Sequence, residues 1–363
     1  MRIGIITFHR AINYGAILQA YALQKYISHK GHQCKIIDYD ADLYNKYRVF
    51  YDVHGFRSLC RALIYLPIIV IKKYKFKCFL RQMDLTKKIK YMDHYWDEID
   101  NDFDLFIVGS DQVWNYEYIG QDGRYLLDFI KDSNKKHSYA SSFGVEKICE
   151  YRDWYKQYLE DFSKIIVREK TGVSIIKEMF GEEFQADIAL DPTFLISKDD
   201  WKNIETKPAN ITNKYILLYV FGNPTELIQY AEILAKMMNC PVIYISNDIV
   251  EKIDAIYARS IGPKEWLYLI DHAEVVITNS YHGLIFSLIF RKEFWVGLNP
   301  PPDNTNSRIL DLLSLVNLKD RIINKYNKPK FVKNMDYEDI YDKLMVEMEN
   351  SKRSLDEIFN TIK

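Results

Sequence analysis

The sequence predicts an α/β protein of two doubly wound, Rossmann-like domains that face a cleft. Short runs rich in Val and Ile alternate with helical patterns, which favours parallel sheets covered by helices on both faces. A length of 363 residues suits two domains. A polar stretch without a clear period, residues 197–214, separates two such alternations. We therefore expect an N-terminal domain over residues 1–200 and a C-terminal domain over residues 214–330.

The N-terminal domain opens with the apolar run RIGIITF, which reads as a core strand, and continues into a helical pattern. Gly31 stands where the C-cap of that first helix is expected. The expected strands of this domain are 2–8, 33–39, 105–109, 137–141, 165–168 and 186–190, and its expected helices are 15–30, 146–162 and 172–180.

The C-terminal domain repeats the alternation with no repeat of sequence. Its expected strands are 214–221, 241–246, 274–279 and 293–299, and its expected helices are 225–239, 264–273, 283–290 and 307–315. A last amphipathic pattern, 337–362, is long enough to return from the second domain to the first. We therefore treat 335–363 as a C-terminal helix that crosses back to the N-terminal domain.

The charge of the chain is balanced on average but strongly uneven along it. Lys+Arg number 49 and Asp+Glu number 50, which argues against general nucleic-acid binding. Residues 57–90, however, carry ten basic residues and one acid, around the apolar run ALIYLPIIVI. That run of 10 residues contains Pro67 and falls short of the roughly 20 that a membrane span needs. The segment predicts either peripheral contact with an anionic membrane or an ordinary helix with a solvated basic face.

The cysteines and the N-terminus bear on the compartment. Five cysteines with no C-x-x-C pair argue against a structural zinc and against a disulfide framework. Met1 leads directly into the first strand, so we expect no signal peptide. The expected location is the cytoplasm, with a peripheral place at the inner face of the plasma membrane as the alternative.

Ligands of doubly wound sheets bind beyond the carboxyl ends of the strands, so polar residues just after strands are the candidate site. After the first strand, Asn13, Tyr14 and Gly15 begin a helix whose positive end suits an anion. The alternative is that Asn13 only caps the helix and Gly15 allows close packing.

A second candidate segment follows the strand 105–109 and consists of Ser110, Asp111, Gln112, Trp114 and Asn115. The carboxylate of Asp111 could accept hydrogen bonds from sugar hydroxyls, and the indole of Trp114 could stack on a sugar face. The alternative is a capped loop in which Trp114 is buried.

Arg168 ends the strand 165–168, where a guanidinium can bind a phosphate or carboxylate with two parallel hydrogen bonds. The alternative is a surface salt bridge. Arg308, at the start of a predicted helix, is a second candidate anion ligand or an ordinary surface arginine.

The last candidate segment joins strand 274–279 to an apolar helix and contains Asn279, Ser280, Tyr281 and His282. A histidine can give and take a proton near neutral pH, so His282 is the candidate acid and base of a reaction. Asn279 and Ser280 could orient it or donate to an anion. A purely structural cap is the alternative.

Six segments resemble the polysaccharide pyruvyl transferase family and stand in the family's order: NYGAILQAYAL, FDLFIVGSDQVWN, KKHSYASSFG, REKTG, DIALDPTFL and ITNSYHGLIFSLI. The resemblance implies a two-domain fold of the GT-B type. It implies transfer of pyruvate from phosphoenolpyruvate onto two hydroxyls of a sugar, such as galactose, as a cyclic ketal in bacterial capsular or exopolysaccharide synthesis. It makes His282 the general acid/base and Arg168 a ligand of the donor.

Some family members have a more Gly-rich turn after the first strand, which makes anion binding at Asn13–Gly15 less secure here. Residues 40–95 match nothing specific in the family and resemble an insertion, basic, apolar and helical. The expected partners are the donor and a sugar acceptor, lipid-linked or oligosaccharide, with no cofactor, metal or nucleic acid. Two alternatives remain: a nucleotide-sugar glycosyltransferase of the same fold, with Glu265 as a possible ribose ligand, and a non-catalytic carbohydrate-binding protein.

Overall fold

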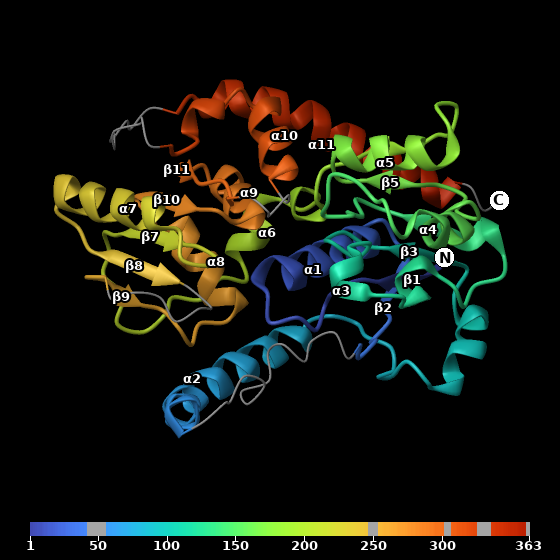
Figure 1. The fold of residues 1–363 in the computed structure, drawn as a ribbon, viewed down its shortest axis with the longest axis horizontal. Coiled ribbons are helices and arrows are strands. Elements are labelled where there is room, and N and C mark those ends of the chain that lie inside the picture. The colour runs from blue at the N-terminus through green and yellow to red at the C-terminus, as the bar shows by residue number, and fades with distance from the viewer. Residues whose placement is uncertain (42–55, 246–252, 301–305, 325–334, 361–363) are drawn as a thin grey trace. The chain divides into compact units, whose positions relative to one another are not determined.

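The computed structural model describes residues 1–41, 56–245, 253–300, 306–324 and 335–360, and for 56–64 it describes the helical path only (Figure 1). Over the described residues the chain forms two compact units. Unit 1 comprises Met1–Tyr51, Leu80–Ile196 and Met345–Lys363, and unit 2 comprises Asp52–Phe79 and Ser197–Leu344. The predicted strand end at Ser246 and the predicted helix end at 361–362 lie outside the described residues.

Unit 1 is built on a parallel sheet in the order β2-β1-β3-β4. Parallel bridges at His137–Lys164 and Ser141–Val167 continue this pairing to β5, which pairs with β6. The strand order reverses direction between β1 and β3, which is the topological switch point of the unit. The strands are β1 (Arg2–Ile6), β2 (Gln33–Ile36), β3 (Leu105–Val108), β4 (Lys136–Ser138), β5 (Ile166–Val167) and β6 (Asp187–Ile188).

The helices of unit 1 cover this sheet and share its core. Helix α1 begins after Asn13 and ends before Gly31, whose φ of 85° is the left-handed conformation typical of a residue just past a helix. Helix α4 is shorter than predicted because Val145 and Ile148 pack against the core from an irregular segment before it. The helices are α1 (Tyr14–His29), α3 (Tyr116–Ile119), α4 (Arg152–Leu159) and α5 (Lys170–Phe180), with 3₁₀ turns η2 (His94–Asp97), η3 (Ile99–Asp102), η4 (Gly123–Leu126), η5 (Ser133–Lys135) and η6 (Pro192–Phe194).

Unit 2 holds a parallel five-stranded sheet in the order β11-β10-β7-β8-β9 (Figure 1). When the five strands are numbered from 1 to 5 along the chain, their order starting from β9 is 3-2-1-4-5. This is the Rossmann arrangement. Its switch point lies between β7 and β10. The strands are β7 (Ile216–Tyr219), β8 (Val242–Ile245), β9 (Ile256–Tyr257), β10 (Val275–Thr278) and β11 (Glu293–Val296).

The helices of unit 2 include one within the stretch 197–214, which was expected to be a linker. At the start of 197–214, Ser197 and Asp200 form a capping box that begins α6, and Trp201 is fully buried against Phe286. The interpretation of 197–214 as a linker or crossover without a clear period therefore missed a short helix at its start. The helices are α2 (Phe56–Leu80), α6 (Lys198–Lys202), α7 (Thr225–Met238), α8 (Pro263–Asp271), α9 (Tyr281–Ile289) and α10 (Ser307–Leu315), with the 3₁₀ turn η7 (Lys319–Arg321).

Two long helices bear on the organisation of the chain. Helix α2 comes early in the sequence but groups with unit 2, apart from its last residue. Helix α11 (Tyr337–Asn360) begins in unit 2 and ends in unit 1. Among the described residues, no helix is both long enough and apolar enough to cross a membrane.

Candidate functional site

In unit 1 the loops after β1 and β3 meet at the switch point. The hydroxyl of Thr7 donates to the carbonyl of Ser110 at 2.9 Å, and the amide of Gln19 donates to the Thr7 hydroxyl at 2.8 Å. Asp111 follows with a φ of 79°, a conformation that non-glycine residues rarely adopt. Backbone strain of this kind is concentrated at functional positions, where the surrounding structure holds it in place. The hydrogen bonds of Thr7 therefore join the β1 loop to the β3 loop beside this strained residue.

Arg168 lies in this loop region, but its guanidinium is engaged by the protein. Its Nη1 donates to Asp191 Oδ2 at 3.0 Å and to the Ser110 hydroxyl at 3.3 Å. Carboxylate oxygens of Asp111 and Glu169 lie 3.8 and 3.7 Å from its other nitrogens. The side chain is fully buried, so it is neither a surface salt bridge nor an open anion ligand. The expectation that Arg168 faces a cleft as a donor ligand is corrected by this burial among three carboxylates.

Four residues of this network were not predicted as site residues: Asp191, Thr193, Glu169 and Ser142. Asp191 accepts hydrogen bonds from the Ser110 hydroxyl at 2.9 Å and, through its other oxygen, from the N–H and hydroxyl of Thr193 at 3.0 and 2.8 Å. Glu169 accepts from the hydroxyl of Ser142 at 2.7 Å. The available signal was the position of Asp191 directly after the predicted strand 186–190.

Trp114 does not line the site. The ring is fully buried, its N–H donates to the carbonyl of Tyr125 at 3.0 Å, and it packs against Phe143. The interpretation of Trp114 as a stacking platform for a sugar is therefore wrong, and the alternative of a buried Trp holds. Asn115 caps α3 by accepting from the N–H of Glu117 at 3.0 Å.

Gln112 and Asn13 form hydrogen bonds within their own segments of the chain. The side-chain oxygen of Gln112 accepts from Asn115 at 2.9 Å. Asn13 caps α1 by accepting from the N–H of Ala16 at 3.3 Å, which confirms the capping interpretation. Tyr14 and Gly15 are buried in the first turn, so the Tyr14 ring offers no face to a sugar.

A second charged cluster follows β1 and β2 and was not singled out from the sequence. Arg10 donates to both carboxylate oxygens of Asp38, at 2.5 and 2.7 Å, and His9 Nε2 lies 3.0 Å from the same carboxylate. Burial would raise the pKa of Asp38, but the hydrogen bonds from His9 and Arg10 outweigh it and lower the pKa to about 2. Asp38 therefore stays ionised and fixes the loop that begins at Thr7.

In unit 2 the predicted segment 279–282 stands at the switch point. The side chain of Asn279 accepts from the N–H of Phe221 at 2.9 Å and donates to its carbonyl at 3.0 Å, which ties the end of β10 to the end of β7. It also donates to the side chain of Asn299 at 2.9 Å. Ser280 caps α9 by accepting from the N–H of Gly283 at 3.3 Å. A Cβ at Gly283 would lie 2.5 Å from the Thr278 hydroxyl, so the close approach of helix and strand requires glycine there.

His282 lies in the first turn of α9, next to Tyr281 and near a group that contains Arg308. The rings of His282 and Tyr281 meet edge to face with centroids 5.6 Å apart, and the Arg308 guanidinium lies 5.6 Å from the Tyr281 ring. His282 and Arg308 are 7% and 8% exposed. The structure therefore brings an imidazole, a phenol and a guanidinium together at a helix N-terminus, where the helix dipole favours an anion. Tyr281 is nearly buried, which leaves little of its ring for a sugar to stack on.

Glu265, the possible ribose ligand, has structural partners. Its carboxylate accepts from the N–H of Gly262 at 3.0 Å as part of the N-terminal capping box of α8, and it forms an ion pair with Lys75 of α2. The described contacts of Glu265 are therefore those of a helix cap and an ion pair.

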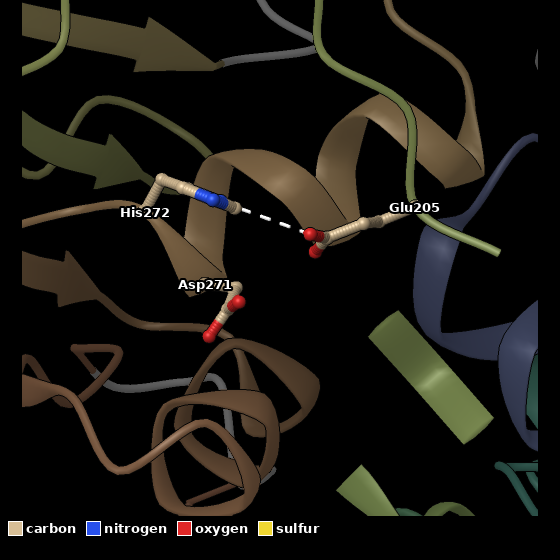
Figure 2. Close-up of side chains that lie close together, drawn as sticks. All are labelled: Glu205, Asp271 and His272. Atoms are coloured by element: carbon tan, nitrogen blue, oxygen red, sulfur yellow. Dashed lines mark ion pairs between the residues drawn. The ribbon is translucent and has the colours of Figure 1, made fainter. Parts of the chain in front are cut away.

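Glu205, Asp271 and His272 form a further cluster in unit 2, away from these predicted residues in the sequence. Figure 2 shows His272 directed toward Glu205, and one ligand atom of each residue lies within 4.8 Å of the others. Burial, and then the charge of Asp271, raises the pKa of Glu205. Lys202, on α6, pairs with Asp271 at 3.2 Å. Because an ammonium group already balances this carboxylate, we assign the cluster to the packing of α6 on α8.

Among solved structures, the chain is similar in fold to UDP-N-acetylglucosamine 2-epimerase from Rickettsia bellii, with 10% identity, a TM-score of 0.46, and a match covering 99% of this chain and 97% of that chain. It is also similar to UDP-GlcNAc 2-epimerase from Methanocaldococcus jannaschii, with 11% identity, a TM-score of 0.47, and coverage of 96% and 93%. A third similar structure is the ADP-heptose LPS heptosyltransferase II of E. coli, with 10% identity and a TM-score of 0.37. That match covers 97% of this chain and 100% of that chain. No curated protein matches the sequence.

The two parallel sheets, with polar residues at both switch points, define an α/β protein of doubly wound, Rossmann-like units. A model of the polysaccharide pyruvyl transferase family matches residues 13–299. The chain belongs to this family of transferases, as the sequence motifs predicted.

Proposed function

We propose that the protein transfers pyruvate from phosphoenolpyruvate onto two hydroxyls of a sugar and closes a cyclic ketal. The observation that carries the proposal is the placement of His282 and Arg308 around Tyr281 at the N-terminus of α9. Tyr281 and His282 lie within the span that matches the family, and Arg308 lies nine residues beyond its end. A proton-transfer group and a cation beside a helix N-terminus suit a donor that carries a phosphate and a carboxylate.

The reaction needs one proton delivered to carbon. Protonation of the donor's methylene gives a methyl group and makes C2 electrophilic; one sugar hydroxyl adds, phosphate leaves, and the second hydroxyl closes the ring. Of the two hydroxyl protons released, one replaces the proton given to the methylene and the other leaves with phosphate. His282 is the residue that we assign to this proton transfer, because imidazole can both accept and donate near neutral pH.

Arg308 is the residue that we assign to the donor's anionic groups. It lies at the start of α10, beside the His282–Tyr281 pair, and the cation–π contact with Tyr281 orients the guanidinium. Arg168 receives a positioning role, because Asp191 and Ser110 already occupy its Nη1. It holds the loop of Ser110 and Asp111, and we propose that the Asp111 carboxylate contributes to binding the sugar acceptor.

We further propose a hexose such as galactose, lipid-linked or within an oligosaccharide, as the acceptor. Synthesis of a bacterial capsule or exopolysaccharide in the cytoplasm is the matching setting. Family membership supports this part of the proposal. The donor is phosphoenolpyruvate, and the transfer chemistry requires no cofactor.

A phosphate-release assay tests the proposal. The full chain is incubated with phosphoenolpyruvate and a panel of simple and lipid-linked β-galactosides, and product is identified by a gain in mass equal to pyruvate less one water. Phosphate release that requires the sugar, with this mass gain, is the expected result. Turnover of nucleotide sugars instead would establish a glycosyltransferase. Sugar binding without turnover of either donor would establish a carbohydrate-binding protein.

A further inference from the structure

Helix α2 presents an apolar stripe to solvent where an amphipathic helix would normally be polar. Its inward side is occupied: Phe76 and Phe79 are buried, Lys75 pairs with Glu265, and the Arg259 guanidinium lies 5.3 Å from the Tyr65 ring. The opposite side carries Val70, Ile71 and Tyr74, which are 53%, 46% and 61% exposed. These three positions recur at helical spacing, so they lie on one face.

Lysines flank this stripe and no acid accompanies it. Lys73 and Lys77 are exposed on the same helix. The sequence of α2 contains six basic residues and no Asp or Glu: Arg57, Arg61, Lys72, Lys73, Lys75 and Lys77. A helix with exposed apolar residues between lysines, and without acids, is complementary to a surface that is anionic outside and apolar just beneath.

We propose that the outer face of α2, defined by Val70, Ile71, Lys73, Tyr74 and Lys77, docks on an anionic lipid surface. The apolar side chains enter the boundary between headgroups and acyl chains, and the two lysines pair with lipid phosphates. Tyr74 is the most exposed of the three apolar residues, and its phenol suits the interface because one end is apolar and the other polar. No helix in the described part of the chain could span the bilayer, so this contact is peripheral.

A matched pair of triple variants tests the docking face. The test variant changes α2 at Val70→Ser, Lys73→Glu and Tyr74→Ser. The control changes the same spacing on α7, where Ile233 and Met237 are 47% and 59% exposed and Lys236 is also exposed: Ile233→Ser, Lys236→Glu and Met237→Ser. Both sets lie on exposed faces of helices of unit 2, and circular dichroism checks the fold of both variants.

Flotation of the full chain with vesicles is the measurement, using vesicles of phosphatidylglycerol and phosphatidylcholine and vesicles of phosphatidylcholine alone. The wild type and the control are expected to float with anionic vesicles at low salt, and the test variant to lose about tenfold or more in partition coefficient. High salt should weaken binding by the wild type, because it screens the lysines.

Three outcomes overturn the proposal: no flotation of the wild type with anionic vesicles at low salt, equal loss in the control, or equal flotation with neutral vesicles. A dimer of the wild type that the test variant dissolves would assign the face to a second copy of the chain instead. Phosphate release with a short-chain, water-soluble galactoside is measured in parallel. It should be equal in the test variant and the wild type, so the docking face and the transfer activity succeed or fail separately.

Discussion

Asp191 Oδ2 lies 3.0 Å from Nη1 of Arg168, and neither side chain is exposed to solvent. The pair joins the end of β5 to the segment after β6, and Ser110 connects it to the end of β3. Three strand ends of unit 1 are thus held by one buried ion pair.

Removing one partner of this pair should destabilise the protein strongly. We expect Asp191→Ala to lower the free energy of unfolding by about 3–5 kcal/mol, because it leaves a buried charge with fewer compensating groups. Denaturant unfolding of Asp191→Ala, Arg168→Met and the double variant measures the coupling free energy between the two side chains. The double variant should cost less than the sum of the single ones, and strict additivity would contradict the pairing.

His282→Ala should abolish most of the transfer activity without unfolding the chain. Loss of a general acid/base lowers kcat by about 10²–10⁴-fold. The matched control is His272→Ala, since His272 is a more exposed histidine of the same unit, stacked on Tyr268. Circular dichroism checks the fold of both variants. Wild-type turnover in His282→Ala would remove His282 from the mechanism.

Arg308→Met should weaken binding of phosphoenolpyruvate more than it slows turnover. A charge-assisted hydrogen bond contributes about 1.5–3 kcal/mol, so the KM for the donor should rise roughly 10- to 150-fold. Arg259→Met is the control, because the Arg259 guanidinium lies in the same way over a tyrosine ring, 4.4 Å from that of Tyr257. Equal rises in both variants would show that loss of a cation–π contact, rather than loss of donor binding, is being measured.

His137 should make the protein lose stability in acid. Burial lowers the pKa of His137 to about 4, and its Nε2–H donates to the carbonyl of Asn134 at 3.0 Å. The unfolded chain takes up this proton near pH 6.5, whereas the folded chain takes it up only near pH 4. Stability should therefore fall as the pH decreases from 6.5 to 4, by about 3 kcal/mol.

Denaturant unfolding of the wild type and of His137→Gln at pH 7 and pH 4 measures this effect. A glutamine amide can replace the Nε2–H donor but takes up no proton in this range. The variant should therefore show a shallower decline than the wild type. Parallel declines in the two proteins would contradict the assignment.

The alternation of apolar strands and helices was predictable because periodicity along the chain determines which faces are buried. This alternation also predicted that polar residues would follow the central strands. These residues are Ser110, Asp111, Asn279 and His282. All four predicted strands of unit 2 are present in its sheet, and the described sheet contains one strand that was not predicted, β9, which has two residues and is too short to show a period.

The sequence could not decide which polar residues are satisfied inside the protein. Arg168 ends a strand as a ligand-binding arginine would, yet Asp191, which engages it, lies 23 positions further on. Trp114 stands among polar residues, yet the Tyr125 carbonyl and the Phe143 ring bury it. Such outcomes depend on contacts between loops, and local patterns carry no information about those contacts.

The division of α11 between the units sets the order in which the chain can complete its folding during translation. Its last turns belong to unit 1, where Ser351 accepts a hydrogen bond from the N–H of Leu190 at 2.8 Å and Leu355 and Ile358 are fully buried. Those residues leave the ribosome after all of unit 2, although unit 1 begins at the N-terminus. The earlier segments of unit 1 therefore keep part of their core uncovered until α11 has been synthesised. Apolar surface exposed during this interval favours aggregation of the incomplete unit.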